Sequence, residues 1–93
     1  MYFIANWKMF GDLRTLNLLD SVIKFSKKNK NTKFRIVYCP PNTLIRPMSK
    51  RLKKTKLEVG AQNCHESEKY GAHTGHVNSK MLKNVGAKYV ILG

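Results

Sequence analysis

Acidic residues are scarce in this chain of 93 residues, which has 5 Asp and Glu against 18 Lys and Arg. Paired carboxylates for acid–base chemistry are nearly excluded, because Asp12 and Asp20 share one helical segment and Glu58 falls within a strand-like run. The remaining two, Glu66 and Glu68, are interpreted as solvated loop residues. The sequence by itself therefore offers no carboxylate pair as a catalytic site.

Cysteine and long apolar runs are also in short supply. Cys39 and Cys64 form no C-x-x-C pair and are too few for a disulfide-rich scaffold, so we expect reduced thiols, with Cys39 as a small buried hydrophobe. A membrane-spanning helix needs about 20 apolar residues, and a signal peptide needs a longer apolar stretch behind a basic start. We therefore expect no membrane partner and a cytoplasmic location.

Four short apolar runs rich in β-forming residues alternate with longer helical patterns. They cover residues 2–5, 34–39, 57–61 and 89–92. Their lack of clean polar alternation is typical of parallel strands covered by helices. Each crossover is long enough to hold a helix, so we predict an α/β protein of order β-α-β-α-β-α-β with parallel neighbouring strands.

Helical spacing predicts three helices between these runs. The first begins with Asp12 as its N-cap and ends in a basic pair. The second is short and contains Pro47, which we place in its first turn because an interior proline would break the helix. The third covers residues 79–85, with Asn78 as its cap and Gly86 closing it.

The loop at 64–77 is the longest irregular stretch, and loops of this length usually carry function or an interface. It holds His65, His73 and His76 beside a cysteine. These ligand types suit zinc, but their spacing matches no structural zinc pattern, so we expect no metal. The last apolar run reaches Gly93 with no helix to cover it and no strand to pair its edge, so the fold looks incomplete.

Polar residues follow the first strand-like run, where parallel α/β proteins bind their ligands. Asn6 and Lys8 are two positions apart, so on an extended chain both point to the same side. An amide and an ammonium together suit an anionic or oxygen-rich ligand. Such a pair is also common in solvated loops, so the pattern alone leaves both interpretations open.

The net charge of +13 is the footprint expected of a nucleic-acid binder. Basic residues are densest at 24–35 and 46–56, but Lys dominates over Arg there. The nearby Phe25 and Phe34 occupy positions that look core-facing rather than free to stack on bases. We therefore favour solvated faces over a functional basic patch and do not expect nucleic acid as a partner.

An ordered set of short motifs resembles the triosephosphate isomerase family. They are Ala5-Asn6-Trp7-Lys8-Met9, Cys39-Pro40-Pro41, Gly60-Ala61-Gln62-Asn63, Gly71-Ala72-His73-Thr74-Gly75, Met81-Leu82-Lys83 and Gly86-Ala87-Lys88-Tyr89-Val90-Ile91-Leu92-Gly93. Each is weak alone, but their order and separations together are highly specific. The resemblance implies the N-terminal half of a (β/α)8 TIM barrel, with residues 1–93 as one partial domain of three and a half βα units.

The resemblance also implies an activity, the interconversion of dihydroxyacetone phosphate and glyceraldehyde 3-phosphate through an enediol, without a cofactor. Lys8 matches the family's catalytic, substrate-binding lysine, and Asn6 matches the asparagine that orients it and contacts substrate. The family's electrophilic histidine and glutamate base lie beyond position 93, so we expect the chain alone to be inactive. The alternatives are a basic nucleic-acid-binding module or a half-barrel that needs a complementary chain.

In this family the loop at 62–77 inserts into a neighbouring subunit, so the resemblance implies a homodimer. The interface residues implied are Gln62, Asn63, Thr74 and Gly75. The sequence departs from the family at two positions of this loop. His76 stands where an acidic residue is usual, and His73 replaces a common aromatic residue.

Overall fold

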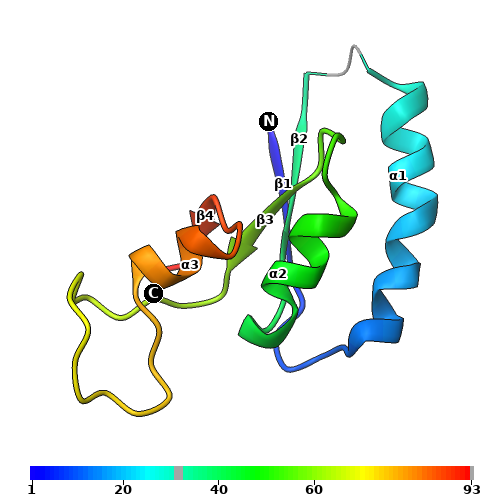
Figure 1. Cartoon of the computed structure of the whole chain (residues 1–93). Coiled ribbons are helices and arrows are strands. Elements are labelled where there is room, and N and C mark those ends of the chain that lie inside the picture. Colours follow the sequence, from blue (N-terminus) through cyan, green and yellow to red (C-terminus); the bar gives the residue numbers. More distant parts are fainter. Residues whose placement is uncertain (31–32, 93) are drawn as a thin grey trace.

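A computed structural model describes residues 1–30 and 33–92 as one parallel four-stranded sheet with helices packed against it (Figure 1). The strands are β1 (Tyr2–Asn6), β2 (Arg35–Cys39), β3 (Glu58–Ala61) and β4 (Tyr89–Val90). The helices are η1 (Leu13–Leu18), α1 (Leu19–Lys28), α2 (Asn42–Arg51) and α3 (Ser79–Asn84). The predicted class and element order are confirmed. The last predicted position, Gly93, lies outside the described residues.

The strands follow one another across the sheet in sequence order, β1-β2-β3-β4. β1 and β2 pair over five positions, from Tyr2 opposite Arg35 to Asn6 opposite Cys39. The other two pairings are shorter and also parallel. Within the described residues, β1 and β4 therefore each have a strand on one side only, as expected of half a barrel.

The first helical segment begins at Asp12 as predicted. The Asp12 carboxylate accepts the backbone N–H groups of Arg14 at 3.0 Å and Thr15 at 3.1 Å, and the Thr15 hydroxyl accepts the Asp12 N–H at 2.9 Å. This reciprocal capping box satisfies free donors at the helix start. The segment is not a single α-helix, because η1 is a 3-10 helix. Its buried Leu16 lies three positions before the buried Leu19, a spacing that stacks at three residues per turn.

Pro47 lies inside α2 as its sixth residue, so its predicted place in the first turn is wrong. Proline has no N–H to donate to the carbonyl four residues earlier, which costs an isolated helix about 3 kcal/mol. Leu44, Ile45 and Met48 on this helix are at most 2% exposed. Burying each such side chain contributes about 1.5–3 kcal/mol, so packing offsets the proline.

α3 has the predicted cap and ends one residue earlier than predicted. The Asn78 side-chain oxygen accepts the Met81 N–H at 3.0 Å. At the other end, Gly86 adopts a φ of +108° and donates its N–H to the Lys83 carbonyl, while Ala87 donates to Leu82. These two backbone hydrogen bonds form a Schellman motif, which ends the helix and turns the chain toward β4.

One hydrophobic core lies between the sheet and the helices. Its buried members are Leu16, Leu19, Ile45, Met48, Leu52, Leu57, Val59, Ala61 and Leu82. Phe25 was predicted to face this core, but it is 49% exposed, because Val22, Ile23 and Ser26 take the inner side of α1. Phe34 is half-buried and packs edge-on against Phe3. Among the described residues, no helix has the length and apolar character to cross a membrane.

Candidate functional site

The polar residues predicted to form a site lie together where β1 ends. Asn6 is the last residue of β1, and its Oδ1 accepts the backbone N–H of Lys8 at 2.9 Å. An asparagine that bonds the N–H two residues later forms an Asx-turn. We predicted an extended chain between the two residues. The strand instead ends at Asn6, and the turn places Lys8 beside it at the same edge of the sheet.

Lys8 has a φ of +56°, in the left-handed region that residues with a Cβ seldom adopt. The cost of this conformation is about 1–2 kcal/mol. Such strain persists only where surrounding contacts impose it, and it concentrates at binding and catalytic sites. The Asn6 side chain is one of these contacts.

Gln62 is the second contact that holds Lys8. Its Nε2 donates to the Lys8 carbonyl at 2.8 Å and to the Cys39 carbonyl at 2.9 Å. Trp7 adds a bond from its backbone N–H to the same Cys39 carbonyl, also at 2.9 Å. One side-chain amide thus ties together the carboxyl ends of β1, β2 and β3. The resemblance assigned Gln62 to the dimer-interface loop, and the structure shows that its side chain also supports the turn at Lys8.

The turn after Lys8 depends on a glycine that was not among the residues predicted from the sequence. Gly11 has a φ of +111°, and a Cβ there would come within 3.1 Å of Leu44 and of the Trp7 ring. Trp7 is half-buried and packs edge-on against Phe10 and Tyr38. The indole anchors the chain on the helix side of the sheet, so the flanking Asn6 and Lys8 stay at its edge.

Cys39 lies at the end of β2, next to this edge. It is 1% exposed, and burial raises the pKa of its thiol. A protonated, buried thiol is a poor nucleophile, so Cys39 is a packing residue, as predicted. Both cysteines are free.

The loop between β3 and α3 projects away from the sheet (Figure 1). Its base is closed by a bond from the His65 N–H to the Val77 carbonyl at 2.8 Å. Of the four predicted interface residues, Asn63, Thr74 and Gly75 are exposed and Gln62 is partly buried.

The three histidines of this loop lie close together. The His65 ring stacks on His73 with centroids 4.3 Å apart, and His76 packs edge-on against His65 at 5.1 Å. Within residues 1–30 and 33–92, no group of three or more His, Cys, Asp and Glu side chains is arranged to hold a metal ion. The rings pack on one another, with His73 and His76 exposed and His65 partly buried.

Comparison with known proteins places this arrangement in a family. Residues 1–93 match the family model described as triosephosphate isomerase. The triosephosphate isomerase of Wolbachia pipientis wMel is 40% identical over 90 residues, which are 97% of this chain and 35% of that protein. The enzyme of Jannaschia sp. strain CCS1 is 42% identical over 92 residues, covering 96% of this chain and 34% of that protein.

The fold agrees with the sequence comparison. The crystal structure of triosephosphate isomerase from Bartonella henselae matches with a TM-score of 0.85 and 32% identity, over 99% of this chain and 36% of that chain. The four parallel strands and their helices correspond to the N-terminal half of a TIM barrel. The chain spans about a third of the length of the relatives it matches. Sequence and fold together show that this chain belongs to the triosephosphate isomerase family.

Proposed function

We propose that residues 1–93 supply the substrate-binding lysine, Lys8, and the N-terminal half of the barrel of a triosephosphate isomerase. The complete enzyme interconverts dihydroxyacetone phosphate and glyceraldehyde 3-phosphate by proton transfer through an enediol, in glycolysis and gluconeogenesis. The single observation that carries this proposal is the constrained turn at the end of β1, where Asn6 and Gln62 hold Lys8 in a left-handed conformation. Strain maintained by two neighbours is expected of a residue with a functional task.

The chemistry at this edge suits a phosphorylated triose. Removal of a proton next to the substrate carbonyl places negative charge on an oxygen, and the Lys8 ammonium can stabilise that charge in a preorganised position. Asn6 uses its Oδ1 on the Lys8 N–H, so its amide NH2 is left to donate to a substrate oxygen. The net charge of +13 also favours capture of a dianionic substrate.

The 93-residue chain by itself is expected to bind without turning over. A general base must lie about 2.6–3.2 Å from the proton that it removes. In the described part of the chain, no carboxylate hydrogen-bonds or forms an ion pair with Asn6 or Lys8. Asp20 pairs with Arg51, and Glu58 lies at the amino end of β3.

A chimera tests the proposal. Residues 1–93 are joined to the remaining two thirds of the Wolbachia relative, and isomerase activity is measured for the chimera and for the 93-residue chain alone. We expect activity in the chimera only. Lys8→Met should lower kcat/KM of the chimera by about 10²–10³-fold, the loss typical of removing one group that stabilises transition-state charge.

Lys80→Met is the matched control, because it removes the same charge from an exposed position on α3. It should leave kcat/KM within about twofold of the parent chimera, as expected of an exposed site away from the chemistry. Equal activity of the Lys8→Met and Lys80→Met chimeras would contradict the role of Lys8. Robust turnover by the 93-residue chain would contradict the need for groups outside it.

We also propose that the loop at 62–77 packs against a second copy of the protein. Thr74 and Gly75 are exposed, and Tyr70 is 85% exposed, which leaves an aromatic side chain free for an interface. Sedimentation of the chimera should give a dimer. Thr74→Arg should shift it to monomer, while Thr43→Arg at an exposed position of α2 should not. A dimer unaffected by Thr74→Arg would rule out this loop as the interface.

We propose the cytoplasm as the site of action. Two free cysteines suit a reducing compartment, and the proposed substrate is a charged intermediate of central metabolism. Cell fractionation followed by immunodetection should recover the protein with cytoplasmic markers, and recovery in an extracellular fraction would refute this placement.

A further inference from the structure

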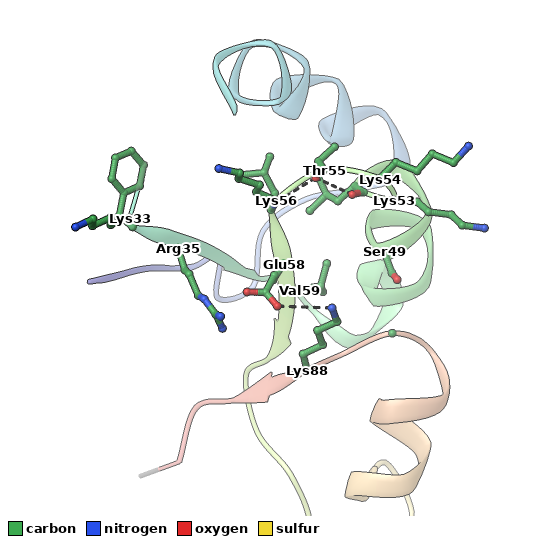
Figure 2. Close-up of a pocket in the computed structure, with 14 residues that line it drawn as sticks. Lys33, Arg35, Ser49, Lys53, Lys54, Thr55, Lys56, Glu58, Val59 and Lys88 are labelled. Carbon is green, nitrogen blue, oxygen red and sulfur yellow. Dashed lines mark hydrogen bonds and ion pairs between the residues drawn. The ribbon is translucent and has the colours of Figure 1, made fainter. Parts of the chain in front are cut away.

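A cavity of about 590 Å³ lies at the amino ends of β2, β3 and β4 (Figure 2). Lys8 follows the carboxyl end of β1, at the opposite end of the sheet. The walls of the cavity come from residues 33–35 at the start of β2, Ser49 on α2, residues 52–59 around the turn into β3, and Gly86 and Lys88 before β4. This volume falls within the range of about 300–1,000 Å³ that is usual for small-molecule sites.

The cavity is strongly basic because two stretches that are separate in the sequence meet there. The charged side chains that line it are Lys33, Arg35, Lys53, Lys54, Lys56, Lys88 and one carboxylate, Glu58. Lys33 and Arg35 thus come from the basic stretch at 24–35, and Lys53, Lys54 and Lys56 come from the one at 46–56. Lys88 is added from the segment before β4. In the sequence these charges are interpreted as solvated faces, but the fold concentrates them around one cavity.

The inner wall of the cavity is organised by hydrogen bonds. The Lys88 Nζ lies 3.6 Å from a Glu58 carboxylate oxygen, and the Tyr89 hydroxyl donates to the other oxygen at 3.1 Å. Arg35 donates to the Tyr89 hydroxyl at 3.2 Å, and its guanidinium also lies 5.8 Å from the centre of the Tyr2 ring. Two cations are therefore held in place by one carboxylate and two tyrosines.

The remaining lysines have no fixed counter-charge. Among the described residues, none of Lys33, Lys53, Lys54 and Lys56 forms an ion pair. Figure 2 shows Lys53 and Lys54 extending from one side of the cavity, and Lys33 and Arg35 lying on the other side. A concave surface lined by charges of one sign raises the local concentration of the opposite ion.

We propose that this cavity binds an oligophosphate anion, either inorganic tripolyphosphate or the phosphate chain of a nucleoside triphosphate. Six cations against one carboxylate exceed what a single phosphate group can neutralise. Lysine is a common phosphate binder, acting as a mobile point charge, and Arg35 adds a planar donor. The cavity is separate from the proposed triose phosphate site, so either proposal can be refuted without refuting the other.

A chain of phosphates fits this cavity better than a nucleic acid strand does. Strand-binding proteins combine a charged groove with exposed aromatic rings on which bases stack. Phe34 is the one aromatic residue among those lining the cavity, and it is half-buried against Phe3. The cations surround a hollow, so the ligand they fit is compact.

Calorimetric titration with sodium tripolyphosphate tests the proposal, with the 93-residue chain at about 50 mM salt, where phosphate contacts are strong. Saturable one-to-one binding is expected. Lys53→Gln combined with Lys56→Gln removes two cations from the cavity and should weaken binding about tenfold or more. The matched control combines Lys24→Gln with Lys27→Gln, which removes the same charge from α1, outside the cavity.

Glu58→Gln is an independent variant that should increase the affinity for tripolyphosphate rather than lower it. It keeps an acceptor for the Tyr89 hydroxyl, removes the one negative charge from the wall and frees Lys88, so tripolyphosphate should bind more tightly. A parallel readout is the thermal midpoint followed by near-UV circular dichroism of Trp7, because a ligand that binds the native state raises it. If the double variant loses the native signal, Lys56→Gln alone replaces it.

The outcomes separate the possible ligands. Equal binding of tripolyphosphate and adenosine triphosphate supports a site for the phosphate chain alone, and tighter binding of the nucleotide supports a nucleotide source. Equal weakening in the cavity and α1 variants would overturn the proposal, because the attraction would then come from diffuse charge. Absence of saturable binding would overturn it as well, and so would binding only to a single-stranded RNA oligonucleotide.

Discussion

The backbone strain at Lys8 leads to a quantitative prediction, because replacing this residue with glycine removes the strain. Lys8 and Lys54 are the two non-glycine residues with positive φ in the described part of the chain, at +56° and +67°. Lys53 is the matched control, because it is an exposed lysine in a turn and does not have a positive φ. Lys8→Gly, Lys54→Gly and Lys53→Gly each remove one charge, so the three variants differ mainly in backbone conformation.

The expected difference follows from two opposing effects. Glycine loses more conformational entropy on folding, which costs about 0.5–1 kcal/mol at an ordinary position such as Lys53. At Lys8 and Lys54, glycine also removes a left-handed penalty of about 1–2 kcal/mol. Lys53→Gly should therefore lower the free energy of unfolding, while Lys8→Gly and Lys54→Gly should leave it unchanged or raise it. The gap between the two kinds of variant should be about 1–2 kcal/mol.

Urea unfolding followed by circular dichroism measures these three free energies in the 93-residue chain. The Lys8→Gly variant should combine unchanged or increased stability with loss of isomerase activity in the chimera, which would mark Lys8 as a residue kept for function. If Lys8→Gly destabilises the chain as much as Lys53→Gly does, Lys8 carries no strain and the argument from strain to function fails.

Three further predictions concern the scaffold. Gly86→Ala should lower the free energy of unfolding by about 2–5 kcal/mol, measured by urea denaturation, because its φ is +108° and the new Cβ would overlap the Ser49 side chain. Asp12→Ala should lower the urea midpoint at pH 7. Backbone N–H donors lower the pKa of Asp12, so its contribution is present above the unfolded-state pKa of about 3.9 and disappears as pH falls through the folded value. Alkylation followed by mass spectrometry should modify the half-exposed Cys64 first and Cys39 only after unfolding, since burial raises the pKa of the Cys39 thiol; equal rates would contradict this.

The sequence predicts the order of elements well, because each one has local signals. The apolar runs, the Asp12 and Asn78 caps and the closing Gly86 act within a few residues of their position. The errors occur where tertiary packing outweighs local preference. Pro47 is tolerated inside α2 because that helix buries three apolar side chains, and Phe25 is exposed because smaller neighbours take the inner side of α1.

The candidate site was predictable only in part. Asn6 and Lys8 follow the first strand-like run in the sequence, and the structure places both at the carboxyl end of β1. The bonds of Gln62 to two carbonyls from distant segments could not be predicted, because they depend on the register of three strands. The basic cavity was missed for the same reason, since residues 33–35, 53–56 and 88 approach one another only in the folded chain.

The central claim is that the end of β1 holds a phosphorylated triose. Nuclear magnetic resonance titration of the chain with dihydroxyacetone phosphate tests it most directly. The backbone amide of Lys8, bonded to Asn6, and the side-chain amide of Gln62 should shift most, while the amide of Lys56 in the basic cavity should stay in place. Unchanged signals from Lys8 and Gln62, or a largest shift at Lys56, would contradict the account.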